Sequence, residues 1–294
     1  MALTTGRWFF FFLLIPFSAF AEKGVAFKQS LLILPHETVG KLLPASIDKN
    51  ELRAVAEFVM KLSYNDLPNK LAKDSLQFQN PETSIFLSGG KSRMDMQSPI
   101  GRQSMIYDKS AGVLFDIFWA QKKYLQVNVA ELKKQRAAVL SELNQNSESH
   151  PGSSQVKPKA HFKKTAKKKK IAGIQCRKFV FQDSSKYHVV WASMRKTKTL
   201  KQLLAFYLDI RNDVDARGGD EPDIWHDFPE AIPLASLKIV RAPGQGLVVE
   251  ISRIDSMNFQ TFMPDFFQTP EDFTRGDIFD TLQLDRSAPT RRQP

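Results

Sequence analysis

Five short segments between residues 84 and 129 constrain the fold more than any other feature of the sequence. They are rich in apolar residues, and glycines or a few polar residues separate each from the next. Connections this short permit antiparallel pairing, whereas parallel strands need a crossover of a dozen residues or more. We therefore expect an antiparallel meander here, and its predicted strands are 84–87, 91–96, 102–107, 112–119 and 123–129.

The same kind of pattern returns after residue 170. Apolar and polar residues alternate over 176–182 and 186–193 around Asp183-Ser184-Ser185, which predicts a hairpin. Two further strands, 235–240 and 247–254, are expected on either side of a Pro-Gly turn. The sheet therefore draws strands from both halves of the chain.

Helical spacing appears at three places. A stripe of leucines follows Asn128, which has Glu131 three residues later as in a capping box. A second helix is expected from a Thr199 cap through Val214 to Gly218-Gly219. A third is expected from about Asp48, followed by a strand over 57–64. Together these elements predict the α+β class.

The N-terminus has the three parts of a secretory signal peptide. Arg7 is its only charge, the apolar run from Trp8 to Phe20 follows, and small residues stand at Ala19 and Ala21. The run is short for a membrane span, which needs about 20 apolar residues, so an uncleaved anchor is the weaker alternative. We predict residues 1–21 to be removed before Glu22 and the protein to be periplasmic or secreted. Since no cysteine follows the run, we do not expect a lipoprotein.

Positive charge is concentrated in one segment. The chain carries a formal charge of +11, and residues 157–170 hold eight lysines without an acid. We predict a Ser/Pro/Lys-rich linker at 147–170, which is either a solvated loop or a contact for anionic lipid headgroups or another acidic envelope polymer. No aromatic residues alternate with these lysines to stack bases, so we do not expect nucleic acid as a partner.

The remaining chain is expected to form one domain. We predict an N-terminal extension at 22–49, a single α+β envelope domain at 50–275 and a disordered tail at 276–294. The single cysteine, Cys176, has no partner for an internal disulfide and is expected to be buried.

Several motifs resemble those of one protein family. The segment Gly90-Lys91-Ser92-Arg93-Met94-Asp95, then Ile106-Tyr107-Asp108 and Lys122-Lys123-Tyr124, resembles the motif order of an uncharacterised bacterial envelope family, domain of unknown function 4412. Lys170–Cys176 and Phe266–Phe273 resemble its later landmarks. The family is similar in layout to the periplasmic lipoprotein carriers (LolA/LolB-like). This resemblance implies a curved antiparallel sheet, an incomplete barrel, with helices packed on one face and a lipid or acyl chain as a possible ligand.

The candidate ligand-binding residues follow from that layout. Residues 113–119 are apolar on both faces of the predicted strand except for Asp116, so both faces need cover. An apolar groove would be lined by Met94, Met96, Phe115, Phe118, Trp119 and Trp191. Contact with a headgroup or an acidic partner would involve Arg93, Lys167, Lys168, Lys169 and Lys170, although Arg93 could instead pair with Asp95.

Catalytic and metal motifs are not found. Gly90-Lys91-Ser92 lacks the earlier glycine of a phosphate loop, and the five histidines lack the spacing of a metal motif. Trp225-His226-Asp227 is interpreted as surface or turn structure. We therefore expect no cofactor, no metal and no enzyme. The alternative to an apolar-ligand carrier is an envelope module for protein–protein interaction or structure.

Overall fold

The computed structural model describes residues 21–74, 76–98, 101–148, 161–214, 223–242, 244 and 246–277. The predicted signal peptide, except Ala21, lies outside the described residues, as do residues 149–160 of the predicted linker and nearly all of the predicted tail. No helix in the part of the chain that is described is long and apolar enough to cross a membrane.

One sheet of twelve strands dominates the structure. Its strands are β1 (Glu22–Leu34), β2 (Glu82–Ser88), β3 (Lys91–Ser98), β4 (Gly101–Asp108), β5 (Val113–Phe118), β6 (Lys123–Asn128), β7 (Lys163–Ile171), β8 (Ile174–Gln182), β9 (Lys186–Ser193), β10 (Ile232–Ala242), β11 (Gly246–Phe262) and β12 (Thr274–Arg275). The helices are α1 (His36–Leu42), α2 (Leu52–Val59), α3 (Leu67–Lys73), α4 (Val129–Glu148), α5 (Lys198–Asp209) and α6 (Ile224–Asp227). Shorter helical turns are η2 (Trp119–Gln121), η3 (Ile210–Val214) and η4 (Pro264–Phe267).

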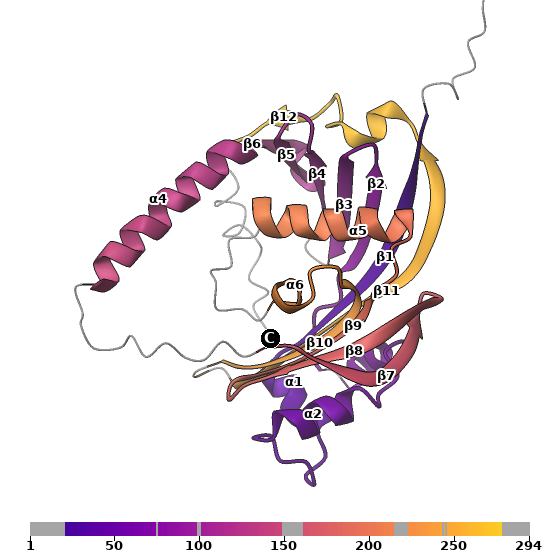
Figure 1. The fold of residues 1–294 in the computed structure, drawn as a ribbon, viewed down its shortest axis with the longest axis vertical. Coiled ribbons are helices and arrows are strands. Elements are labelled where there is room, and N and C mark those ends of the chain that lie inside the picture. The colour runs from indigo at the N-terminus through magenta and orange to yellow at the C-terminus, as the bar shows by residue number, and fades with distance from the viewer. Residues whose placement is uncertain are drawn as a thin grey trace, which may run out of the picture.

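The sheet joins two meanders through its first strand. Strands β2 to β6 and strands β7 to β11 each follow one another in order, and β1 lies between β2 and β11. All pairs are antiparallel except β12 with β6. The sheet curves around α5 and α6 without closing, which leaves β12 at one end and β7 at the other (Figure 1). The predicted α+β class with a curved antiparallel sheet is confirmed.

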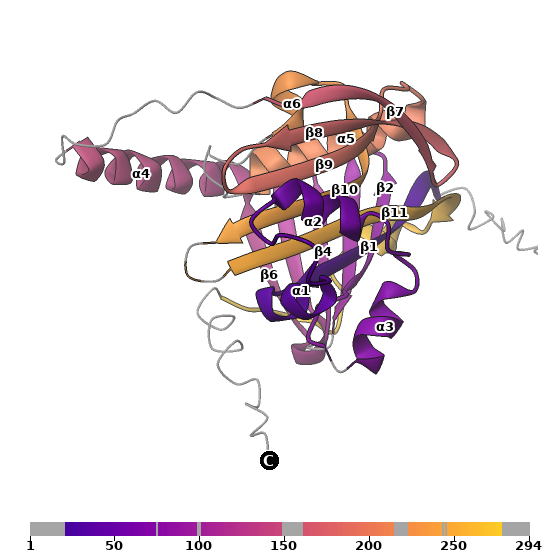
Figure 2. The same ribbon diagram turned by 90° about the horizontal axis from the view of Figure 1, so that it is seen from below.

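Helices cover both faces of this sheet, whereas we expected them on one. Successive side chains of a strand point to opposite faces, and β1 shows the result. Val25 and Phe27 pack into the core beneath α5, while Leu32 and Leu34 pack into the core beneath α1, α2 and α3. We call the α5 side the inner face and the α1 side the outer face; Figure 2 shows α1, α2 and α3 gathered on the latter.

Two sequence predictions near the N-terminus were wrong. The strand expected over 57–64 does not form, because Leu52, Val55 and Val59 share one helical stripe and are buried in the outer-face core. The expected N-terminal extension contains β1, which lies at the middle of the sheet. A strand that is buried on both faces lacks a simple alternation of apolar and polar residues, and so it was missed.

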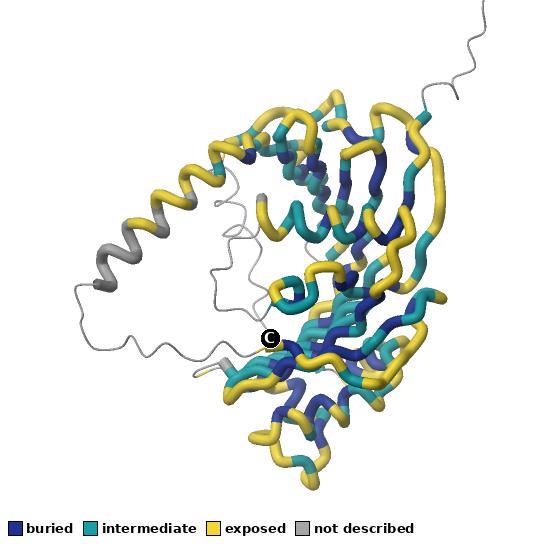
Figure 3. The backbone as a smooth tube through the Cα atoms, in the orientation of Figure 1, coloured by how far each residue is buried: buried dark blue, intermediate teal, exposed yellow. Residues whose placement is uncertain are grey.

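Local capping explains where the two longest helices begin. Asn128 Oδ1 accepts hydrogen bonds from the backbone N–H groups of Ala130 (3.0 Å) and Glu131 (3.2 Å), as the sequence indicated. The cap of α5 is Thr197 instead of the predicted Thr199, since Thr197 Oγ1 accepts from the N–H of Leu200. Helix α4 then extends away from the sheet, and its described residues are mostly exposed (Figure 3).

Candidate functional site

The six predicted groove residues do not lie together. Met94 packs against the inner-face core, and Met96 shares its face by strand alternation. Phe118 is directly opposite Gln103, which is itself opposite Met96, so it too faces inward. Phe115 and Trp119 instead pack on the outer face, in the cluster around Phe262 and Phe267. Trp191, the sixth residue, is half-buried on β9 and packs against both the inner-face and the outer-face core.

Two cavities stand out among the described residues, and the predicted groove residues line neither. One of about 110 Å³ lies on the inner face between α5, α6 and the sheet, with Tyr207, Trp225 and Leu234 in its wall. The other, of about 510 Å³, is a wide depression with polar walls that include Ser30, Arg253 and Asp255. Pockets for drug-sized ligands usually have about 300 to 1,000 Å³ and mostly apolar walls. Neither cavity combines that size with that lining.

Arg93 is buried in a network of partners, not exposed for a headgroup. It is 7% exposed, its Nε donates to Asp95 Oδ1 over 2.7 Å, and its Nη1 donates to the backbone carbonyl of Phe266 over 2.8 Å. Arg102 also donates to Asp95 and lies 4.0 Å from the ring centre of Trp119. The prediction of headgroup contact at Arg93 was therefore wrong, and the predicted pair with Asp95 is confirmed.

This network holds the C-terminal segment against the sheet. The guanidinium of Arg93 lies 4.7 Å from the ring centre of Phe266, whose ring stacks on that of Phe262. Phe273 meets Trp119 edge to face, at 5.3 Å between ring centres. The aromatic residues that we assigned to a groove, Phe115 and Trp119, thus belong to a closed cluster that covers the outer face of β2 to β6.

The lysines predicted to lie in a linker form an edge strand. Among the described strands β7 is the last of the sheet and pairs with β8 alone. The chain reverses between the two strands at Ala172 and Gly173, which both have positive φ as in a two-residue hairpin turn. The lysines of β7 are all exposed, and they are Lys163, Lys164, Lys167, Lys168, Lys169 and Lys170. The assignment of 147–170 as a linker was wrong for residues 163–170.

Further positive charge lies beside this strand. Arg177 on β8 is opposite Lys168, and Lys178 lies next to it in a buried position. Burial lowers the pKa of Lys178, and the neighbouring positive charge of Lys167 lowers it further. The nearby Glu57 already pairs with Arg53 at 3.0 Å. Among the described residues, no ion pair includes a lysine of β7.

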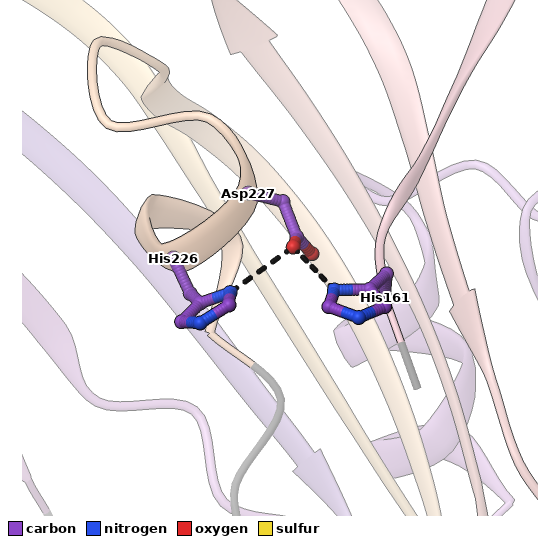
Figure 4. A group of neighbouring side chains, drawn as sticks. All are labelled: His161, His226 and Asp227. Carbon is purple, nitrogen blue, oxygen red and sulfur yellow. Dashed lines mark hydrogen bonds and ion pairs between the residues drawn. The ribbon is translucent and has the colours of Figure 1, made fainter. Parts of the chain in front are cut away.

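A second polar group lies where β7 begins. His161 Nδ1 is 2.6 Å from Asp227 Oδ1, and His226 Nδ1 is 3.2 Å from the same oxygen (Figure 4). The backbone N–H of Phe162 donates to the other carboxylate oxygen over 2.7 Å. Partial burial opposes ionisation of Asp227, but the hydrogen bonds from His161, Phe162 and His226 outweigh it, so its pKa is below the ordinary range.

The short helix α6 positions two of these three residues. Asp223 caps it by accepting from the N–H of Trp225, and Trp225 Nε1 donates to the carbonyl of Ala231. Ile224 and Phe228 pack into a third core with Phe162. No other group of at least three metal-ligating side chains is found within the described ranges. The spacing of residues in the sequence could not reveal the group of His161, His226 and Asp227, because His161 and Asp227 are 66 residues apart.

Comparison with known proteins does not identify the chain. No protein-family model matches it, and no curated protein matches it. PNGF-II, solved in a C2 crystal form, aligns with a TM-score of 0.34 and 10% identity, over 90% of this chain and 33% of that chain. MucB in complex with MucA(peri) aligns with a TM-score of 0.32 and 9% identity, over 86% of this chain and 57% of that chain. The chain thus spans less than two thirds of the length of either matched chain. The resemblance to envelope family 4412 stays a prediction.

Proposed function

We propose that this is an exported protein that binds anionic phospholipid surfaces through the lysines of β7. The observation that carries the proposal is the position of these six exposed lysines on the end strand of the sheet. Nine residues of strand span about 30 Å. Each lysine close to an anionic leaflet contributes about 1 kcal/mol of attraction, so the strand as a whole supplies enough for peripheral binding.

The shape of the strand suits a surface better than a pocket. The lysines of β7 project from both faces of the sheet beside its free edge. If this edge approaches a membrane, the ammonium groups of both faces can reach the membrane surface. An ammonium group is a compact point charge on a flexible stem, whereas selective recognition of a single phosphate favours the planar fork of arginine. The expected target is therefore an extended anionic surface and not one bound molecule.

Two features favour lipid over other polyanions. No aromatic side chain occurs between Lys163 and Lys170 to stack on bases, which argues against nucleic acid. The predicted signal-peptide cleavage, between Ala21 and Glu22, falls directly before the first residue of β1. Cleavage there leaves the sheet intact, and an exported protein meets membrane surfaces.

The apolar-ligand hypothesis stays a prediction that the described cavities do not favour. An acyl chain needs a continuous apolar space, and the inner-face cavity of about 110 Å³ is below the usual range for ligand pockets. The predicted lining residues are divided between Met94, Met96 and Phe118 on the inner face and Phe115 and Trp119 on the outer face. One groove cannot contain both sets.

The test is co-sedimentation of the purified chain with lipid vesicles. We expect binding to vesicles that contain phosphatidylglycerol, no binding to pure phosphatidylcholine, and a steep loss of binding as ionic strength rises. Replacing Lys167, Lys168, Lys169 and Lys170 by Gln removes about 1 kcal/mol per side chain, so we expect affinity to fall by up to about 10³-fold.

A matched control separates strand position from total charge. The exposed lysines Lys41, Lys61, Lys70 and Lys73 lie on or beside the outer-face helices, and their replacement by Gln makes the same change in net charge. We expect this variant to bind almost as the wild type does. Equal losses in both variants, or no binding to anionic vesicles at all, contradict the proposal. Capture of an acidic protein with no vesicle binding would move the assignment to a protein partner.

A further inference from the structure

The side chains of His161, just before β7, and of His226 and Asp227, on α6, are of the types that bind divalent transition metals. Two imidazoles and one carboxylate form a nitrogen-rich donor set, which suits zinc and neighbouring ions and does not suit calcium or magnesium. One ligand atom from each of His161, His226 and Asp227 lies within 4.8 Å of the others. We propose that this group binds one Zn²⁺ ion or an ion of the same type.

The distances are close to those of a zinc site. Bonds of about 2.0 to 2.1 Å from zinc to nitrogen or oxygen place tetrahedral ligands about 3.3 Å apart. The separation of His226 Nδ1 from Asp227 Oδ1 is 3.2 Å, and that of His161 Nδ1 from the same oxygen is 2.6 Å. An increase of about 0.7 Å in the separation of His161 Nδ1 from Asp227 Oδ1 brings this pair to the tetrahedral spacing. The ion then takes the place of the shared hydrogen bonds.

The backbone already orients the carboxylate. Phe162 donates its N–H to Asp227 Oδ2 over 2.7 Å, which leaves Oδ1 directed at the two imidazoles. A hydrogen bond of this kind to a ligating group fixes its direction and is a regular feature of metal sites. The two rings flank the carboxylate, 5.7 Å apart at their centres and inclined by 34°. The ligand set is therefore held by α6 and by residues 161–162 just before β7, and it does not depend on the ion for its assembly.

The site is open to solvent and incomplete. The side chains of His161 and His226 are each 57% exposed, and that of Asp227 is 14% exposed. Three protein ligands leave the fourth tetrahedral position for water or a small anion. The ion would also join α6 to the start of β7, two segments 65 residues apart. Its charge would add to that of the lysine strand that follows.

The experiment is a titration of the chain, purified without a polyhistidine tag, with Zn²⁺ in a metal-free buffer. Calorimetry is expected to give a molar ratio near one. The urea midpoint of unfolding is expected to rise with Zn²⁺ concentration, because the ion binds only the folded arrangement. His161→Gln, His226→Gln and Asp227→Asn are each expected to weaken Zn²⁺ binding by at least about tenfold.

Controls distinguish this site from adventitious binding. His36 lies on α1 of the outer face, where its Nδ1 accepts from the N–H of Leu247, and His36→Gln is expected to bind Zn²⁺ as the wild type does. Circular dichroism without metal shows whether each variant is folded, and the visible spectrum with Co²⁺ reports the coordination directly. Saturation only at millimolar Zn²⁺, or equal binding by folded His226→Gln and the wild type, overturns the proposal.

Discussion

The two ends of the sheet are built in opposite ways. At one end the chain covers its own last strand: β12 pairs with β6, Phe273 lies on Trp119, and Lys122 pairs with Asp272. At the other end β7 has no strand beyond it and carries exposed lysines. An uncovered edge invites pairing with other chains, and lysines discourage it. The contacts at the covered end therefore contribute folding stability, while the lysines at the charged end stay exposed to solvent.

The largest change in the free energy of unfolding is expected in the aromatic cluster of the covered end. Phe267 is 5% exposed and its ring meets those of Phe262 and Phe266, each at 5.2 Å between centres. Phe267→Ala is expected to lower the free energy of unfolding by about 3 to 5 kcal/mol, measured by urea denaturation. Phe259 is 77% exposed, and Phe259→Ala should change it by less than about 0.5 kcal/mol. Similar losses in both variants would show that the cluster does not hold the covered end.

The buried ion pair at the covered end gives the next largest effect. Arg93→Met removes the donor to the backbone carbonyl of Phe266. It also removes one of the three hydrogen-bond partners of Asp95, which keeps those from Arg102 and Ser104. We expect a loss of about 2 to 3 kcal/mol in the free energy of unfolding. Arg102 has a side chain that is 42% exposed, so Arg102→Met should lose about 1 kcal/mol or less. The reverse order would assign the pairing energy to the exposed partner.

Two carboxylates of this region, Asp95 on β3 and Asp116 on β5, should respond to pH with opposite signs. Burial raises the pKa of Asp95, but hydrogen bonds from Arg93, Ser104 and Arg102 outweigh it, and the net shift is downward. Burial raises the pKa of Asp116, and the single hydrogen bond from Gln103 does not offset it.

The sign of each effect follows from linkage. A lowered pKa gives stability that is present above the unfolded-state value, about 3.9, and is lost as pH falls through the lower folded-state value. A raised pKa gives stability that is present below about 3.9 and is lost as pH rises through the folded-state value. At pH 7, Asp95→Asn should therefore destabilise the protein, and Asp116→Asn should be neutral or stabilising. Denaturation curves at pH 7 and at acidic pH test this, and equal signs in the two variants refute it.

The smallest effect on stability is expected at the charged end. Replacing Lys167 to Lys170 by Gln should change the free energy of unfolding by less than about 1 kcal/mol, since no described carboxylate pairs with these lysines. The same variant should scatter more light on standing, because its edge strand has lost protective charge. A loss of 2 kcal/mol or more would show that the lysines have a structural role.

Much of the fold could be predicted from local patterns. The meander of β2 to β6, the hairpin around Asp183 and the cap at Asn128 depend on residues close in sequence, and all three are confirmed. Strand β7 was missed because six lysines in eight residues suggest solvation, although Ile171-Ala172-Gly173-Ile174 carries a turn signal. The lysine-rich composition suggested a linker, whereas the turn residues Ala172 and Gly173 indicate the hairpin that the structure has.

The sites were harder to predict because they depend on contacts between distant residues. Phe115 and Trp119 needed cover, as their strand indicated, but that cover comes from Phe266 and Phe273 far along the chain. His161 meets His226 and Asp227 because its neighbour Phe162 shares a core with Ile224 of α6. A single sequence shows the periodicity of a strand, but it does not show which segment packs on each face of that strand. It therefore cannot distinguish a ligand-binding groove from a face that another part of the chain covers.

The central place of β1 has a consequence for biosynthesis. Glu22 pairs with Phe262, so the first strand must wait until about 240 later residues have been made before its second neighbour exists. Pairings this distant in sequence form slowly, because a long loop must close first. The β2 to β6 meander can form early in synthesis, but the two halves of the sheet cannot join until β11 has been made. The sheet is therefore completed late, an order that is compatible with the export that we propose.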